Sequence, residues 1–174
     1  MRIPLEEAFR GGTKTITMQS TEPGLDGNHS SREKRYDVKI PPGIMPGQKI
    51  RLSGQGGKGS GGSGDLYLKV EIEPHPRFRP EGHDLYTELA ITPWEAALGA
   101  QIDIQTLDET VTLKVPSGTQ SGQKLRLRAK GMPKPKGLRG DLYAVMKIKV
   151  PKKLSKKERQ LFEELSKVSS FNPR

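Results

Sequence analysis

Apolar and polar side chains alternate along most of the chain, which is the period of a β-strand with one buried face. In the first half of the chain the predicted strands lie around 16–18, 36–40 and 66–72. In the second half they lie around 85–91, 102–104, 111–115 and 142–148. We therefore expect a mostly β protein.

Two short stretches break this alternation and predict helices. Pro4 precedes Glu6 and Glu7, and glycines follow at 11–12, so proline, acids and glycine stand where a short helix favours them. Residues 92–95 (Thr-Pro-Trp-Glu) form a capping-box pattern, and Gly99 ends the helix that they begin.

A third helix is predicted in the tail. A second capping-box pattern at 155–158 is followed by Leu161, Phe162 and Leu165 at helical spacing. A single amphipathic helix of about 14 residues is marginal in isolation, so its apolar stripe must pack on something. A second copy of the chain is a good candidate, and we expect a homodimer.

The chain contains an internal repeat. Residues 38–43 (Val-Lys-Ile-Pro-Pro-Gly) return as 113–118 (Leu-Lys-Val-Pro-Ser-Gly), and Gly-Asp-Leu-Tyr at 64–67 returns at 140–143. A repeat of this length indicates one small domain present twice. We expect two similar β-sandwich-like modules, each with a short helix, and then the tail helix. The expected ranges are 1–79 for the first module, 80–153 for the second and 154–174 for the tail.

The two copies differ at their beginnings. The second copy opens with a predicted strand at 84–91, whereas the first has only residues 1–3 in that place, so we expect the chain to begin inside a domain of a longer protein. In both copies the aspartate of Gly-Asp-Leu-Tyr, Asp65 or Asp141, is predicted to fix the loop before a strand, because short acids stabilise turns.

Composition narrows the function classes. The 174 residues carry a net charge of +10 and no cysteine, which excludes disulfides and cysteine zinc sites. No apolar run approaches the roughly 18 residues of a membrane span, so we expect a cytoplasmic protein without a membrane partner. The positive charge indicates either a solvated basic surface or nucleic-acid binding.

Candidate catalytic and metal sites are weak. Residues 54–59 match a bare GxGxxG pattern, but a strand follows where a phosphate-binding loop needs a helix. His29, His75 and His83 have no metal-ligand spacing, and no serine or cysteine stands in a nucleophile setting. We expect a non-enzymatic protein without a metal or other cofactor.

The motifs together resemble a known family. Leu-Glu-Glu-Ala-Phe-x-Gly at 5–11, Pro-Pro-Gly at 41–43, the two Gly-Asp-Leu-Tyr motifs and His-Pro-x-Phe at 75–78 are similar to the C-terminal peptide-binding region of DnaJ-type J-domain co-chaperones. The resemblance covers nearly the whole chain. The chain carries neither the family's J domain nor the cysteine-rich zinc module, so it resembles the zinc-free class.

The resemblance implies a function and a site. A chain of this kind is expected to bind unfolded or hydrophobic polypeptide segments for a DnaK-type chaperone, and without its J domain it is not expected to stimulate that partner's ATPase by itself. The implied peptide-binding residues are Ile16, Met18, Tyr36, Val38 and Phe78. Because a half-buried sheet has one buried face per strand, these residues are either an open groove or ordinary core, and Phe78 is either part of the groove or a plug between the modules.

Further contacts are implied by the same resemblance. An acidic tail of the partner chaperone is expected to contact basic residues of the first module, with Lys34, Arg35, Lys49 and Arg51 as candidates. Leu161, Phe162 and Leu165 correspond to the family's dimerisation helix. The alternative is a basic nucleic-acid-binding protein. Two features argue against it: the chain has only nine aromatic residues, and they form no evident stacking cluster in a basic groove. DNA binding is expected at most as a secondary activity.

Overall fold

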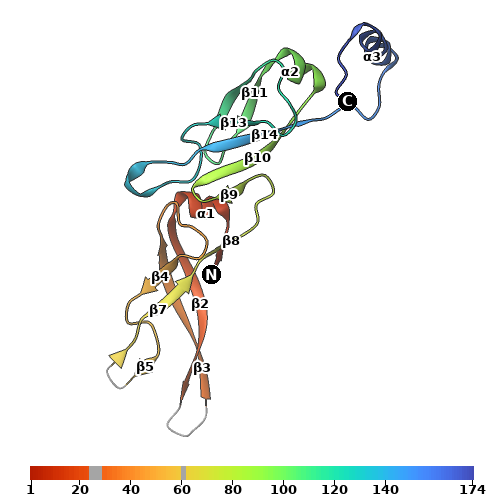
Figure 1. Cartoon of the computed structure of the whole chain (residues 1–174). Coiled ribbons are helices and arrows are strands. Elements are labelled where there is room, and N and C mark those ends of the chain that lie inside the picture. Colours follow the sequence, from red (N-terminus) through yellow and green to blue (C-terminus); the bar gives the residue numbers. More distant parts are fainter. Residues whose placement is uncertain (24–28, 60–61) are drawn as a thin grey trace.

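The computed structural model describes residues 1–23, 29–59 and 62–174 and shows two β-rich lobes with a helix beyond the second (Figure 1). Strands dominate the described elements, so the prediction of a mostly β chain with short helices is confirmed. We call residues 1–79 the first module and residues 80–153 the second module.

The first module is built around one long hairpin. Strand β2 (Gly12–Pro23) pairs antiparallel with β3 (His29–Ile40), with Gly12 opposite Ile40 at the base of the hairpin. Strand β4 pairs with β7, β5 with β6, and β1 runs parallel to β8. The bounds are β1 (Arg2–Ile3), α1 (Leu5–Arg10), β4 (Lys49–Leu52), β5 (Lys58–Gly59), β6 (Gly62–Ser63), β7 (Leu66–Lys69) and β8 (Glu71–Ile72).

The strand expected at 66–72 is divided in two at Val70. The Val70 N–H donates to the Gln48 carbonyl at 2.8 Å, and its own carbonyl accepts from the Gly47 N–H at 2.8 Å. One residue later, the Glu71 N–H donates to the Met1 carbonyl at 2.9 Å. The chain therefore changes its pairing partner from the β4 side to the β1 side, which alternation alone does not reveal.

The second module is a two-layered unit. Its main sheet has the order β13-β14-β10-β9, with β10 and β14 parallel at its centre, and the hairpin of β11 and β12 forms the other layer. Leu85 and Met146 from the sheet and Val115 from the hairpin share one buried core. The bounds are β9 (Arg79–Glu81), β10 (Asp84–Ile91), α2 (Pro93–Leu98), β11 (Ala100–Gln105), β12 (Thr110–Val115), β13 (Lys124–Leu127), a 3-10 turn (Pro135–Gly137) and β14 (Leu142–Ile148).

The sequence repeat is also a structural repeat. Arg51 of β4 lies opposite Tyr67 of β7, and Arg126 of β13 lies in the same register opposite Tyr143 of β14. The Asp65 carboxylate accepts the Gly54 N–H at 3.0 Å, and the Asp141 carboxylate accepts the Ala129 N–H at 2.8 Å. The prediction that these aspartates fix the loops before their strands is confirmed.

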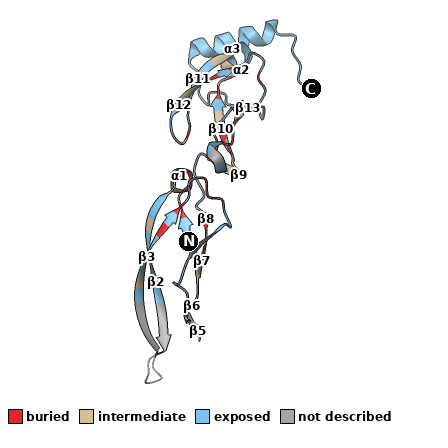
Figure 2. Cartoon of the chain, turned by 90° about the vertical axis from the view of Figure 1, so that its left-hand side faces the viewer, coloured by how far each residue is buried: buried red, intermediate tan, exposed pale blue. Residues whose placement is uncertain are grey.

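The helix boundaries follow the predicted signals. Thr92 and Glu95 form a capping box at the start of α2, and Ser155 and Glu158 form another at the start of α3 (Lys156–Val168). Helix α3 buries none of its residues against the rest of the chain (Figure 2). In the described part of the chain, no helix is both long and apolar enough to cross a bilayer.

One apolar cluster runs through both modules. It includes Phe9 of α1, Phe78 from the segment between the modules, and Met132 of the second module, which is fully buried. Gly43 adopts a φ of +77°, and a Cβ at this position would lie 2.1 Å from the carbonyl oxygen of Pro133. The two modules therefore meet so closely at this point that only glycine fits.

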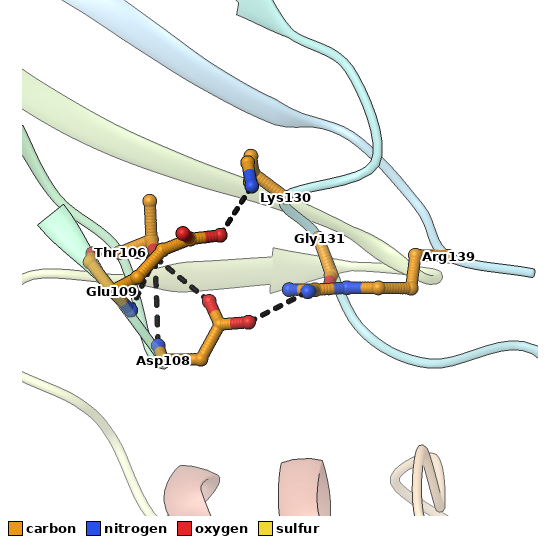
Figure 3. Close-up of polar contacts among 6 residues, drawn as sticks. All are labelled: Thr106, Asp108, Glu109, Lys130, Gly131 and Arg139. Atoms are coloured by element: carbon orange, nitrogen blue, oxygen red, sulfur yellow. Dashed lines mark hydrogen bonds and ion pairs between the residues drawn. The ribbon is translucent and has the colours of Figure 1, made fainter. Parts of the chain in front are cut away.

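A polar cluster borders the same junction (Figure 3). The Arg139 guanidinium donates to the Asp108 carboxylate at 2.7 Å and to the Gly131 carbonyl at 3.1 Å, and it lies 5.0 Å from the centre of the Phe9 ring. Lys130 forms an ion pair with Glu109. These contacts fix the turn between β11 and β12 to the loop before β14 and to α1.

Candidate functional site

The predicted peptide-binding residues of the hairpin lie on one face. Ile16 stands directly opposite Tyr36, and Met18 stands opposite Lys34. Val38 pairs with Lys14 two residues nearer the base. Because directly opposed residues and every second residue share a face, the apolar residues of β2 and β3 form a single stripe.

Burial changes along this stripe. At the base, Ile40 is 3% exposed and Val38 is fully buried. Ile16 and Tyr36 are half-buried in the middle, and Met18 is 36% exposed farther out. The two ends of the stripe therefore differ. Val38 belongs to the buried core, whereas the outer residues are partly exposed and accessible to a ligand. We call Ile16, Met18 and Tyr36 the outer stripe.

Phe78 lies in the interior, at the junction between the modules. It is 3% exposed, its ring stacks on His75 with centroids 5.2 Å apart, and it belongs to the shared apolar cluster. The His75 Nδ1 accepts the Phe78 N–H at 3.0 Å, and its Nε2 lies 3.1 Å from the Glu6 carboxylate. The arrangement matches the alternative in which Phe78 plugs the junction between the modules, and this conformation leaves the implied peptide-binding role of Phe78 almost no surface for a ligand.

The opposite face of the hairpin is polar. The Thr15 hydroxyl donates to the Asp37 carboxylate at 2.6 Å, and Arg35 lies opposite Thr17 on this face. Lys34 is on the outer-stripe face, because it pairs with Met18. Two adjacent candidate cations therefore project from opposite sides of the same strand.

The other two candidate cations are on β4. Arg51 forms an ion pair with Asp65 at 2.6 Å. The hydrogen bond from the Gly54 N–H, together with this guanidinium, lowers the pKa of Asp65 below its usual range. Arg51 thus has a structural partner, whereas Lys49 points toward a groove that the sequence did not reveal.

That groove lies between the end of β3 and β4. Apolar side chains form its floor, Ile44 is 3% exposed there, and the groove is bordered by two lysines. The prolines after β3 indicate a turn in the sequence, and only the folded chain places them beside β4. The lining residues are Lys39, Pro41, Pro42, Ile44, Gln48, Lys49 and Ile50.

The tail helix presents its apolar stripe to solvent. Leu161 is 52% exposed and Leu165 is 58% exposed, while Phe162 between them is half-buried. The hydrogen bond from the Ser155 backbone N–H, followed by that from the Ser155 side chain, lowers the pKa of Glu158 and keeps this cap ionised. The helix is well capped, and the described part of the chain leaves Leu161 and Leu165 uncovered.

Comparisons with known proteins agree with the motifs. Residues 1–151 match the family described as the DnaJ C terminal domain. The curved DNA-binding protein of Coxiella burnetii is 44% identical over 177 residues, which cover 99% of this chain and 55% of that protein. Proteins with the same name from Pseudomonas putida and Pseudomonas syringae pv. tomato are 42% and 40% identical, and each match covers 100% of this chain and 56% of the relative. The chain therefore spans just over half the length of these relatives.

Proposed function

The chain belongs to the DnaJ C-terminal domain family, and on this premise we propose that it holds unfolded or apolar polypeptide segments for a DnaK-type chaperone. The observation that carries the proposal is the outer stripe. Ile16, Tyr36 and Met18 lie side by side on two paired strands and stay partly exposed. Apolar contact is non-directional, so such a surface accepts many different clients.

The strand pairing supplies a second contribution. In the described part of the chain β2 pairs only with β3, so its other edge offers backbone N–H and C=O groups. An extended client that pairs with such an edge gains main-chain hydrogen bonds and places alternate side chains on the stripe. Complete burial of one apolar side chain contributes about 1.5–3 kcal/mol. Ordering of the client opposes this gain, so a single site binds weakly.

A double variant tests the peptide-binding face. Ile16→Asp with Tyr36→Asp places two charges on the outer stripe, and we expect at least about tenfold weaker binding of a permanently unfolded protein by fluorescence anisotropy. The matched control is Thr17→Asp with Gln19→Asp, which places the same charges on exposed positions of the opposite face. Equal binding by the two double variants would refute the assignment.

We also propose that α3 makes the chain a homodimer. The exposed positions of Leu161 and Leu165 support this proposal, because a stripe of this kind gains from burial against a copy of itself. Two client sites in one particle raise avidity for any client long enough to span both. Removal of residues 155–174 is expected to halve the mass measured by light scattering, and a dimer that survives the deletion contradicts this role.

For the acidic tail of the partner chaperone, we propose contacts with Lys34, at the outer stripe, and Lys49, in the β3–β4 groove. Both are lysines beside apolar surface, which suits a peptide that carries acids and an apolar residue. Arg35 contributes less to this proposal, because it projects from the opposite face, and Arg51 contributes less, because it does not line the β3–β4 groove. Lys49→Gln is expected to weaken binding of an acidic peptide about threefold or more, with Arg35→Gln as the control.

A second function, DNA binding, is favoured by two observations. The relatives described above are named curved DNA-binding proteins, and this chain carries a net charge of +10. Binding to the phosphate backbone weakens steeply as salt rises, whereas apolar client binding does not. Titration of duplex DNA and of an unfolded protein at several salt concentrations therefore separates the two functions.

A further inference from the structure

Half of the net charge of the chain lies in one short segment after the second module. Residues 149–159, which we call the basic segment, hold six basic residues and one acid, a net charge of +5 against +10 for all 174 residues. All six basic side chains are exposed. They are Lys149, Lys152, Lys153, Lys156, Lys157 and Arg159.

Several cations elsewhere in the chain are paired with acids. Arg79 contacts Glu81 at 2.7 Å, and Lys147 contacts Glu88 at 2.9 Å. No ion pair is formed by the basic segment within the described parts of the chain. Its one acid, Glu158, caps α3 by accepting the Ser155 N–H at 2.7 Å. The net charge of +5 is therefore not reduced further by ion pairs with the described part of the chain.

The segment is anchored to the second module at its first residue. The Lys149 N–H donates to the Ile91 carbonyl at 2.9 Å, so the segment continues the line of β14 before it leaves the second module toward α3 (Figure 1). Lys156 and Arg159 are three residues apart on α3 and share the side opposite Leu161. These two cations can thus contact a ligand while the apolar stripe packs against another helix, whereas Lys157 lies one turn before Leu161 on the side of the stripe.

We propose that the basic segment binds the phosphate backbone of double-stranded DNA. This inference rests on the second function proposed above and assigns it a site. A row of exposed lysines complements a polyanion that carries one charge about every 1.7 Å along its axis. The segment contains no aromatic residue for base stacking, and lysine contacts act as point charges, so the contact positions DNA without reading its sequence.

The proposal is tested by two variants that remove equal charge. One changes Lys152, Lys153, Lys156 and Lys157 to Gln. The control changes to Gln four exposed cations outside the segment: Lys69, Lys114, Arg128 and Lys134. Each lost phosphate contact reduces the slope of log affinity against log salt by about 0.9. For a 20-base-pair duplex of mixed sequence, we expect the slope of the segment variant to fall by about 2–4 and its affinity near 0.1 M salt by at least about tenfold. The control is expected to lose less than about threefold.

The outcomes separate the site from the function. If the unaltered chain binds no duplex DNA even at low salt, DNA binding itself is refuted. If both variants lose the same affinity, the chain binds DNA through its general charge and the assigned site is wrong. If a polyglutamate peptide binds the unaltered chain more tightly than the duplex does, and only the segment variant loses it, the ligand is an acidic polypeptide and the proposal is overturned. Circular dichroism and light scattering establish that both variants keep the fold and the mass of the unaltered chain.

Discussion

The hairpins of the two modules share a register at the base and diverge beyond it. In the first module Val38 pairs with Lys14 and Tyr36 with Ile16, and in the second Leu113 pairs with Ile102 and Val111 with Ile104. Each strand of the first hairpin has 12 residues, whereas each strand of the second has six. The same repeat therefore yields a short hairpin covered by its own module and a long one that reaches beyond it.

The ends of the hairpins explain their different burial. Ile104 is 6% exposed, because the short hairpin turns at once into the cluster of Thr106, Asp108 and Arg139. Ile16 is half-buried, because its strands continue outward. Both positions hold isoleucine, so the greater exposure of Ile16 follows from the length of its hairpin rather than from a different residue type.

The largest expected effect tests the shared base. Val38→Ala and Leu113→Ala each remove buried methyl groups, and we expect each to lower the free energy of unfolding by about 2–4 kcal/mol. Chemical denaturation measures this loss, provided that the variant and the unaltered chain show the same dependence of unfolding free energy on denaturant concentration. A change below about 0.5 kcal/mol at either position would show that the bases of the two hairpins are not equally packed core regions.

A graft sharpens the difference between the hairpins. Replacing residues 18–34 by the four-residue turn 106–109 gives the first hairpin the length of the second, with Thr17 and Arg35 in the places of Gln105 and Thr110. The module is expected to fold, because its base is unchanged, while affinity for an unfolded protein falls by about tenfold or more. Because the graft keeps Ile16 and Tyr36, client binding that survives it would show that the extra length of the hairpin is not needed for the site.

The turn of the short hairpin gives a pH-dependent effect. Partial burial opposes ionisation of Asp108, but hydrogen bonds from Arg139 and Thr106 outweigh it and lower the pKa. A lowered pKa stabilises the fold above the ordinary value of about 3.9, and this stabilisation is lost as the pH falls through and below that value. Asp108→Asn is expected to cost about 1 kcal/mol at pH 7 and to flatten the stability profile between about pH 4 and pH 2. Parallel profiles for the two proteins would contradict this role.

The smallest effect concerns two equivalent tyrosines. Tyr143 stacks on Tyr86 with centroids 5.1 Å apart, while Tyr67, at the same place in the first module, is 56% exposed. We expect Tyr143→Ala to cost about 1 kcal/mol more stability than Tyr67→Ala, because only the former loses an aromatic pair. Thermal unfolding of both variants measures the difference, and equal costs would mean that the stacking contributes nothing.

The sequence alone is sufficient to predict the strands, the helix caps and the repeat, because these features depend on local patterns. Alternation around Tyr36 and the capping boxes at Thr92 and Ser155 predict elements that the structure contains. Strand pairing joins residues that are distant in the sequence. Local patterns therefore could not predict the division at Val70 or the parallel contact of Tyr86 with Tyr143.

The same limit applies to the candidate site. Period two places Ile16, Tyr36 and Val38 on one face, as the structure has them, but it carries no information on how far the core extends along that face. Phe78 follows a proline in an irregular segment, where no periodicity distinguishes a buried ring from an exposed one. Its burial depends on Phe9 and Met132, which are distant in the sequence and belong to the same cluster.

The apolar cluster that crosses the junction has a thermodynamic consequence. Two repeats of this size with separate cores would melt as two independent units, each with a small enthalpy and a broad transition. Here Phe9, Phe78 and Met132 belong to one buried cluster, so neither module can lose its packing without exposing the other. Heating is expected to unfold both modules in one cooperative step, and each copy of the repeat thereby protects its neighbour from partial opening.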